Sequence, residues 1–233
     1  MKIGIIVAME KELVKLTSLL SSLTVGQVGN KTFYCGTIGQ HEVCIQQCGI
    51  GKVNASIGCV EMIKFFSPDA VVSSGCAGGY GDDIHIEDVV VSSELVYHDV
   101  YCGKAIDDTT IYGQVQGLPA RFKADPYLLS KSKELAKKTD VKIHHGLIVT
   151  GDWFVDTQEK MRHIVGLFPE ACAIDMESAA IAQTCYIYNV PFISFRIVSD
   201  VPLSDEKASQ YHDFWNHVAE QSFSITSSFI KIL

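Results

Sequence analysis

The chain has 233 residues, of which 47% are hydrophobic, and its formal net charge is −8 at pH 7. This length and apolar content suit a single α/β domain over residues 1–233, and the acidic balance excludes a basic surface for binding nucleic acid. No apolar run reaches the roughly 20 residues that span a membrane, and the first residues form no export signal, so we expect a cytoplasmic location without membrane contact.

Eight cysteines are spread along the chain, many of them in runs that have the pattern of strands. Since the sequence shows no export signal, we expect reduced, buried thiols in place of a disulfide framework. Cys44 and Cys48 are four residues apart, but no second pair of cysteines or histidines stands at zinc-ligand spacing. The sequence therefore predicts no metal and no other cofactor.

Hydrophobic periodicity and turn residues predict strands and helices that alternate along the chain. The predicted strands cover residues 1–8, 32–38, 42–48, 69–74, 88–93, 142–149, 171–174 and 190–200. The predicted helices begin at residue 9, run from the turn at 49–54 to 66, cover 126–138, begin at 175 and cover 204–233. Residues 101–119 are irregular and predict a long loop, which in a compact domain is usually functional or an interface. Nearly continuous apolar strands indicate a largely parallel sheet.

Three carboxylates stand at separate strand ends. Asp200 ends the last strand, and ligands of open α/β sheets bind beyond the carboxyl ends of strands, although a helix cap is an equally good reading of Asp200. Glu12 lies in the first strand-to-helix turn, where an acid also favours the positive end of the helix dipole. Glu177 lies in the first turn of a helix, a placement that favours the ionised carboxylate as a hydrogen-bond acceptor. These three side chains are candidate functional groups.

Other strand ends carry small or aromatic residues. Residues 75–79 are almost all glycine or alanine, which leaves room for a ligand and exposes backbone N–H groups to it. Trp153 and Phe154 could stack on a flat heterocycle, although aromatics in such places more often close a core. The turn at 49–54 matches neither the Walker A motif nor the dinucleotide fingerprint, so it predicts only a tight turn that a ligand could approach closely.

Taken together, these strand ends resemble the nucleoside phosphorylase/hydrolase family over essentially the whole chain. The resemblance implies a three-layer fold, with a central mixed twisted sheet flanked by helices, and irreversible hydrolysis of the N-glycosidic bond of methylthioadenosine and S-adenosylhomocysteine. The segments that carry the resemblance are Ile3-Gly4-Ile5-Ile6, Ala8-Met9-Glu10, Gly49-Ile50-Gly51-Lys52-Val53, Ala77-Gly78-Gly79, Tyr97-His98-Asp99, Gly151-Asp152 with Phe154, Asp175-Met176-Glu177 and Ser199-Asp200.

The resemblance also implies roles for individual residues. Asp200 would protonate adenine N7, Glu12 would activate the water that attacks the anomeric carbon, and Glu177 would bind the ribose hydroxyls. Phe154 would stack on adenine, and Arg196 would help to hold the water. The other implied substrate-binding residues are Ala8, Met9, Ile50, Cys76, Ala77, Gly78, Val155, Met176 and Ser199. Hydrolysis of an N-glycoside requires an acid for the leaving base and a carboxylate that assists water, which agrees with these roles.

The chain departs from the family pattern in two places. Cys76 stands where serine is common, and residues 100–110 differ from the best-known members in a region that helps to form the 5′-alkylthio pocket across a dimer interface. A homodimer is therefore expected, and the preferred 5′ substituent stays open. Two other functions stay open as well. One is a purine nucleoside phosphorylase of the same fold, which the scarcity of arginines disfavours, and the other is an inactive nucleoside-binding protein.

Overall fold

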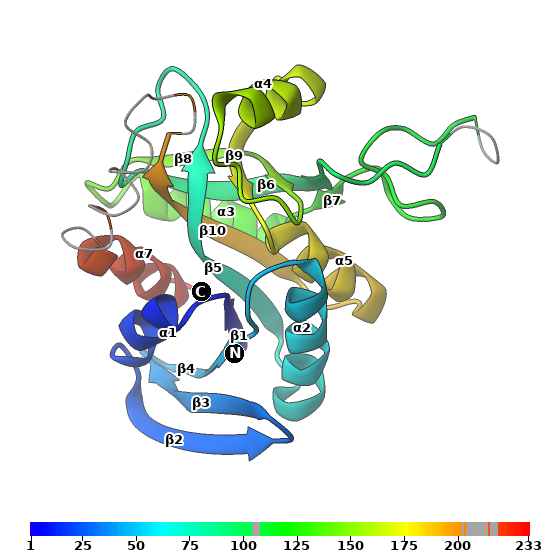
Figure 1. The fold of residues 1–233 in the computed structure, drawn as a ribbon. Helices are drawn as coiled ribbons and strands as arrows, with labels where there is room; N and C mark the ends of the chain where they lie inside the picture. The colour runs from blue at the N-terminus through cyan, green and yellow to red at the C-terminus, as the bar shows by residue number, and fades with distance from the viewer. Residues whose placement is uncertain (104–107, 202, 204–213, 215–218) are drawn as a thin grey trace.

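The computed structural model describes residues 1–103, 108–201, 203, 214 and 219–233. Within these ranges the chain forms one ten-stranded mixed sheet and a set of flanking helices (Figure 1). The strands are β1 (Lys2–Val7), β2 (Ser21–Val28), β3 (Lys31–Ile38), β4 (His41–Gln47), β5 (Ala70–Gly79), β6 (Val89–Tyr97), β7 (Phe122–Lys123), β8 (Ile143–Thr150), β9 (Ala171–Asp175) and β10 (Phe192–Asp200). The helices are α1 (Glu10–Thr17), α2 (Lys52–Phe66), α3 (Pro126–Ala136), α4 (Gln158–Leu167), α5 (Ser178–Tyr188) and α7 (Ala219–Lys231).

Strand β5 is the branch point of the sheet. It pairs in parallel with β1 and β10 and antiparallel with β9. Because β10 also pairs with β6, β6 with β8 and β8 with β9, the strands β5, β10, β6, β8 and β9 form a closed ring. The strands β1, β4, β3 and β2 extend from β5 as an open wing. The sheet is therefore mixed, as the family resemblance implied. The expectation of a largely parallel sheet, which came from the apolar strands, is wrong.

Alternating side chains along each strand pack against two different layers of helices. On β1, Ile3 and Ile5 join a core cluster with residues of α1, α3 and α7, whereas Ile6 joins a second cluster with residues of α2 and α5. Figure 1 shows α1 and α7 on one side of β5 and α2 and α5 on the other. This alternation is the two-residue period of a strand that is buried on both faces. The three-layer arrangement is confirmed.

All the predicted strands occur, but the sequence analysis missed two others, β2 and β7. Most side chains of β2 are exposed, so this strand has no apolar pattern that could reveal it. Strand β7 has only two residues, too few to show an apolar pattern. The predicted helix at 204–233 is confirmed over α7, and its first part lies largely outside the described residues.

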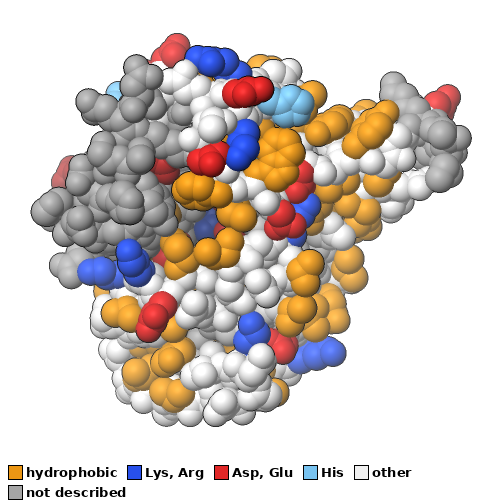
Figure 2. Space-filling model, in the orientation of Figure 1, with side chains coloured by type: hydrophobic (Ala, Val, Ile, Leu, Met, Phe, Trp, Pro, Cys, Tyr) orange, Lys and Arg blue, Asp and Glu red, His pale blue; other side chains and the backbone are white. Residues whose placement is uncertain are grey.

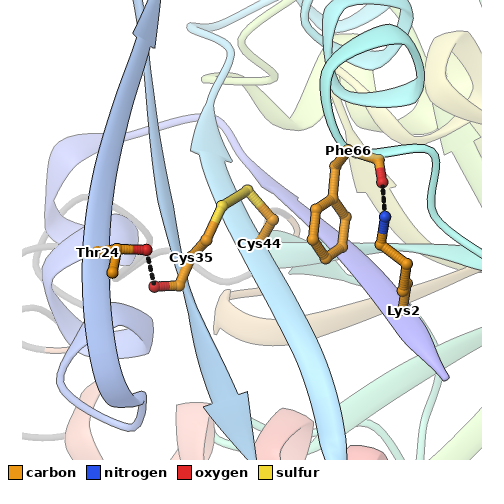
Figure 3. Close-up of a disulfide and its surroundings, with 5 residues drawn as sticks. All are labelled: Lys2, Thr24, Cys35, Cys44 and Phe66. Carbon is orange, nitrogen blue, oxygen red and sulfur yellow. Dashed lines mark hydrogen bonds between the residues drawn. A yellow bond between two sulfur atoms is a disulfide. The ribbon is translucent and has the colours of Figure 1, made fainter.

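The expectation of reduced thiols is wrong for two cysteines. Cys35 and Cys44 form a disulfide between the neighbouring strands β3 and β4 (Figure 3). The antiparallel register pairs these two residues directly across the hairpin, so their side chains leave the sheet side by side. The sequence contained this signal, because a hairpin that turns at residues 39–40 places 35 opposite 44.

The segment at 101–119 is a projecting arm. Its described residues form turns but no helix or strand, as the irregular pattern predicted, and Figure 1 shows the segment extending away from the body. Tyr101 and Ile111 on this arm are exposed. Among all the described residues, no helix has the length and apolar character that crossing a bilayer requires.

Candidate active site

One pocket collects nearly all the predicted site residues. It has about 690 Å³ of empty space, its open mouth included. Every predicted site residue except Arg196 lines it, namely Ala8, Met9, Glu12, Ile50, Cys76, Ala77, Gly78, Phe154, Val155, Met176, Glu177, Ser199 and Asp200. The pocket lies beyond the carboxyl ends of β1, β5, β9 and β10, where the strand-end argument located it.

Glu12 is held by three backbone donors at the base of the pocket. It is buried in the first turn of α1, where one carboxylate oxygen accepts the N–H groups of Ala8 and Met9 at 2.9 and 3.0 Å. The other oxygen accepts the N–H of Cys76 at 3.0 Å. Burial raises the pKa of Glu12, while Arg196 and these donors oppose the rise. A fixed carboxylate with a raised pKa is suited to accept a proton.

Arg196 lies behind the pocket wall. Its side chain is 1% exposed, and its Nε donates to Asp175 at 2.6 Å and to Ser178 at 3.0 Å. One terminal nitrogen donates to Ser73 Oγ at 3.0 Å and lies 3.7 Å from Glu177. Although burial acts to lower the pKa of Arg196, the surrounding carboxylates raise it above the ordinary value. The guanidinium therefore stays charged and compensates several buried acids at once.

Asp175 is a buried residue that the sequence analysis did not select. It lines the pocket, and one oxygen accepts the hydroxyl of Thr150 at 2.6 Å and the N–H groups of Glu177 and Ser178 at 3.3 and 3.2 Å. The other oxygen binds Arg196. Its position just before Glu177 was the available signal, but the long-range partners Thr150 and Arg196 cannot be read from local sequence. Asp175 fixes the start of α5 and orients the arginine.

Glu177 is the N-cap of α5 and is 6% exposed. One oxygen accepts the N–H of Gly51 at 3.0 Å, and the other faces Arg196. Burial raises the pKa of Glu177 to about 7, and the charges of Asp175 and Glu12 add to this rise. The expectation that its helical position keeps it ionised is therefore wrong in direction, because loss of water outweighs a helix-terminus effect of at most about 2 kcal/mol.

Asp200 lines the pocket at the end of β10. The pairing of β10 with β5 shifts register between Val198 and Asp200, which is where the strand reaches the pocket. Asp200 is 5% exposed and accepts the hydroxyl of Ser199 at 2.8 Å. The helix that Asp200 was alternatively expected to cap would begin at 204, which lies outside the described residues.

The mouth of the pocket is aromatic and apolar. Phe154 is 57% exposed and Trp153 is 39% exposed, so these rings border open space and do not close a core. Ile50 is exposed on the same rim. Deeper in the pocket, burial raises the pKa of the Cys76 thiol well above its usual value, so the thiol stays protonated and is a poor nucleophile.

The described residues contain no group of three or more His, Cys, Asp or Glu side chains placed to hold a metal ion. The polar groups that line the pocket include the carboxyl groups of Glu12, Asp175, Glu177 and Asp200 and the hydroxyl of Ser199. The pair Glu12 and Asp200 can act as proton acceptor and proton donor on a ligand between them, while Phe154 and Trp153 offer a surface for a flat ring.

Comparisons with known proteins identify the family of the chain. The family model described as the phosphorylase superfamily matches residues 2–231. The 5′-methylthioadenosine/S-adenosylhomocysteine nucleosidase of an Exiguobacterium species is 42% identical over 217 residues, which cover 91% of this chain and 90% of that protein. The nucleosidase of the same name from Staphylococcus haemolyticus is 38% identical and covers 99% of this chain and 100% of its own.

Solved structures give the same result. The S-adenosylhomocysteine nucleosidase of Streptococcus pyogenes, in complex with 5-methylthiotubericidin, has a TM-score of 0.92 at 36% identity and covers 100% of this chain and 97% of its own. The 5′-methylthioadenosine/S-adenosylhomocysteine nucleosidase of Streptococcus pneumoniae, with a transition-state inhibitor, has a TM-score of 0.91 at 34% identity. The match covers 100% of this chain and 99% of that one. The chain belongs to the phosphorylase superfamily and, within it, to the family of 5′-methylthioadenosine/S-adenosylhomocysteine nucleosidases.

Proposed function

We propose that the protein hydrolyses the N-glycosidic bond of 5′-methylthioadenosine and S-adenosylhomocysteine, giving adenine and the 5-thioribose product. The observation that carries this proposal is the convergence of Glu12, Glu177 and Asp200 in one pocket that also has an exposed aromatic wall. An N-glycosidase requires these parts, because the leaving base needs a proton, the water needs a base and the flat purine needs a stacking surface.

In the proposed reaction Asp200 donates its proton to N7 of adenine while the bond between the anomeric carbon and N9 breaks. The electrons of that bond pass to the neutral base. A water molecule then forms a bond to the anomeric carbon and gives a proton to Glu12. The three N–H donors that hold Glu12 favour a fixed orientation of its carboxylate, which positions the water. Arg196 supports this step through the carboxylates that it compensates.

The remaining pocket residues bind the substrate in this proposal. Glu177 accepts hydrogen bonds from the ribose hydroxyls, with Met176 beside it, and Phe154 stacks on the adenine. Backbone groups of Val155 meet the edge of the base, and Ser199 orients Asp200 through its hydroxyl. The walls around the sugar and the 5′ substituent consist of Ala8, Met9, Ile50, Cys76, Ala77 and Gly78.

A phosphorylase would need cations for a phosphate dianion, and the described residues do not offer them at the pocket. Arg121 pairs with Glu94 and Glu170, and Arg162 lies on α4, where it donates to Gln158. Arg196 is sequestered behind the wall by Asp175. Since the pocket is lined by acids, water is the better supported nucleophile.

We further propose a homodimer in which the partner completes the pocket mouth. Exposed apolar side chains on three neighbouring regions support it, namely Tyr101 and Ile111 on the arm, Val53 and Ile57 on α2, and Tyr186 and Ile187 on α5. Figure 2 shows hydrophobic side chains along the projecting arm and on the adjoining surface. Such patches mark protein interfaces, and two-fold dimers are the commonest assembly.

A cytoplasmic location is proposed from the sequence alone. The Cys35–Cys44 disulfide does not support it, since disulfides are rare in reducing compartments. Alkylation of thiols in freshly lysed cells, followed by mass spectrometry of the peptides, distinguishes the two states. Free Cys35 and Cys44 in the cell would agree with the cytoplasm, and a persistent disulfide would argue for an oxidising compartment.

The activity is tested by incubating the protein with 5′-methylthioadenosine in the presence and absence of phosphate, in water enriched in ¹⁸O. The expected result is release of adenine at the same rate in both conditions, with ¹⁸O at the anomeric position of the thioribose. Formation of thioribose 1-phosphate, or a rate that rises with phosphate to saturation, would establish a phosphorylase. Binding of the nucleoside without release of adenine would establish a binding protein.

A further inference from the structure

The start of α2 is held by acidic side chains from two other segments. The N–H of Gly51 donates to Glu177 at 3.0 Å, and the N–H of Lys52 donates to Asp152 at 2.8 Å. These are among the N–H groups that a helix leaves unpaired at its first turn, and carboxylates are the partners that its dipole favours. The turn before α2 is therefore attached both to the pocket carboxylate Glu177 and to the loop after β8.

A third carboxylate, Asp99, joins the same two segments. Its side chain is 10% exposed, and its oxygens accept the ammonium of Lys52 at 2.7 and 2.8 Å. One of these oxygens also accepts the N–H of Asp152 at 2.8 Å. The ammonium lies 3.7 Å from the Asp152 carboxylate and 5.4 Å from the centre of the Tyr97 ring. Asp99 thus connects the first turn of α2 with the loop that follows β8.

Neither Asp99 nor its partners line the pocket, but their chain neighbours do. Ile50 directly precedes Gly51, and Trp153 directly follows Asp152, and both line the mouth. The approach of the two segments is tight, because a Cβ on Gly51 would lie 2.9 Å from an oxygen of Asp152. The separation of these two walls therefore depends on the contacts that Asp99 organises.

We propose that Asp99 is a positioning residue, which sets the distance between the Ile50 wall and the aromatic wall and, through Gly51, steadies Glu177. This inference rests on the proposed function for its substrate. Glu12 is held by its own set of backbone donors and Asp200 by Ser199, so neither depends on Asp99. Loss of Asp99 therefore affects the binding of substrate more than the chemical step.

The kinetic test compares Asp99→Asn with Glu134→Gln, which removes an exposed carboxylate from surface ion pairs on α3. Because Asp99→Asn removes the closer of the two carboxylates that face the Lys52 ammonium, it is expected to raise KM for 5′-methylthioadenosine about tenfold and to change kcat less than about threefold. The control Glu134→Gln is expected to leave KM and kcat unchanged. The double variant Asp99→Asn with Lys52→Met is expected to have a KM close to that of Asp99→Asn alone, since both substitutions break the same ion pair between Lys52 and Asp99.

A second readout works without turnover. In a Trp215→Phe background Trp153 is the sole tryptophan, so acrylamide quenching reports how well its loop is held. Asp99→Asn is expected to increase the quenching constant, and Glu134→Gln to leave it unchanged. If the wild type released no adenine, the proposed function would fail, while quenching would still decide the role of Asp99.

Three results would overturn the role of Asp99. They are an unchanged KM, a loss confined to kcat, and quenching of Trp153 equal to that of the control. If Asp99→Asn did not fold, Lys52→Met alone would take its place, because it removes the same ion pair from the more exposed side. Unchanged KM and quenching in that variant would equally overturn the proposal.

Discussion

Two buried glutamates of the same pocket have different hydrogen-bond environments. Glu12 accepts three backbone N–H groups, whereas Glu177 accepts one and lies beside Asp175 and Arg196. Burial raises the pKa of both carboxyl groups. In addition, the three N–H donors fix the orientation of the Glu12 carboxylate more firmly than the single donor fixes that of Glu177. This difference supports the assignment of the water to Glu12 and of the ribose to Glu177.

Removal of the charge at Glu12 is expected to slow the chemical step. Glu12→Gln keeps the shape of the side chain but cannot accept a proton, so kcat should fall about 10²–10⁴-fold while binding of substrate stays largely intact. The control is Glu10→Gln, because Glu10 lies exposed in the same turn of α1. Steady-state kinetics of both variants decide the matter, and normal turnover by Glu12→Gln would show that another group activates the water.

Asp200→Asn is expected to keep the fold and to lose the acid. The amide retains an oxygen that can accept the Ser199 hydroxyl, so a folded protein with unchanged thermal unfolding is expected. The rate of adenine release should fall about 10²–10⁴-fold, since the leaving base then receives no proton from the enzyme. Turnover close to that of the wild type would refute the role.

The raised pKa of Glu177 predicts a pH-dependent cost in stability. The unfolded chain titrates this group near 4.5 and the folded protein near 7, so between these values only the unfolded state loses the proton. The free energy of unfolding therefore decreases as pH rises through this window, by about 3 kcal/mol at most, and stays lower above it. Above pH 7 Glu177→Gln should be more stable than the wild type while binding ribosides more weakly.

Urea denaturation of the wild type and Glu177→Gln at pH 5 and pH 8 measures this effect. The difference in stability between the two proteins should be small at pH 5 and should favour the variant at pH 8. Glu10→Gln serves as the control because its side chain is exposed. If the free energy of unfolding changed with pH in the same way for the wild type and Glu177→Gln, the prediction would be contradicted.

At the scale of secondary-structure elements, β5 brings the proposed catalytic groups together. It pairs with β1, which leads into α1 and Glu12, and with β10, which carries Arg196 and Asp200. Where β5 passes between Glu12 and Arg196 it has Gly75, and a Cβ there would lie 2.7 Å from the carboxylate and 2.3 Å from the guanidinium. The absence of a side chain at Gly75 is therefore a condition for the close approach of Glu12 and Arg196 to β5.

Gly75→Ala should consequently disturb the site, whereas Gly166→Ala should not. The added methyl at 75 overlaps two buried charged groups that cannot move apart freely, so a destabilisation of about 1–3 kcal/mol and a large loss of activity are expected. Gly166 lies in α4 with open space around it, and alanine there should add up to about 1 kcal/mol of stability. Thermal unfolding and adenine release of both variants test the contrast. Wild-type activity in Gly75→Ala would contradict it.

At the scale of the whole molecule, the exposed apolar surface predicts a dimer in solution. Light scattering should give twice the mass of 25.6 kDa, and Val53→Lys combined with Ile187→Lys should reduce it to the monomer, since buried charges without partners oppose association. Val14→Lys is the control, because Val14 is equally exposed but lies on α1. A monomeric wild type at working concentration would refute the homodimer.

Local sequence patterns determined eight of the ten strands in the described residues, most of the helices and the position of the site at the strand ends. They were sufficient because the apolar run of β10, the glycines at the end of β5 and the placement of Glu12 each depend on a few adjacent residues. The resemblance to a family then supplied the roles that isolated residues cannot reveal. Of its site residues only Arg196 lies outside the pocket lining.

The tertiary structure decided what depends on distant partners. The closure of β5, β10, β6, β8 and β9 into a ring, the network of Asp99 with Lys52, and the contacts of Asp175 all join residues that are far apart in sequence. The pKa of Glu177 depends on burial by the whole fold, which no local pattern encodes, and the prediction from its helix position had the wrong direction. Periodicity specifies which face of an element is buried, but only the packed chain specifies which charges meet there.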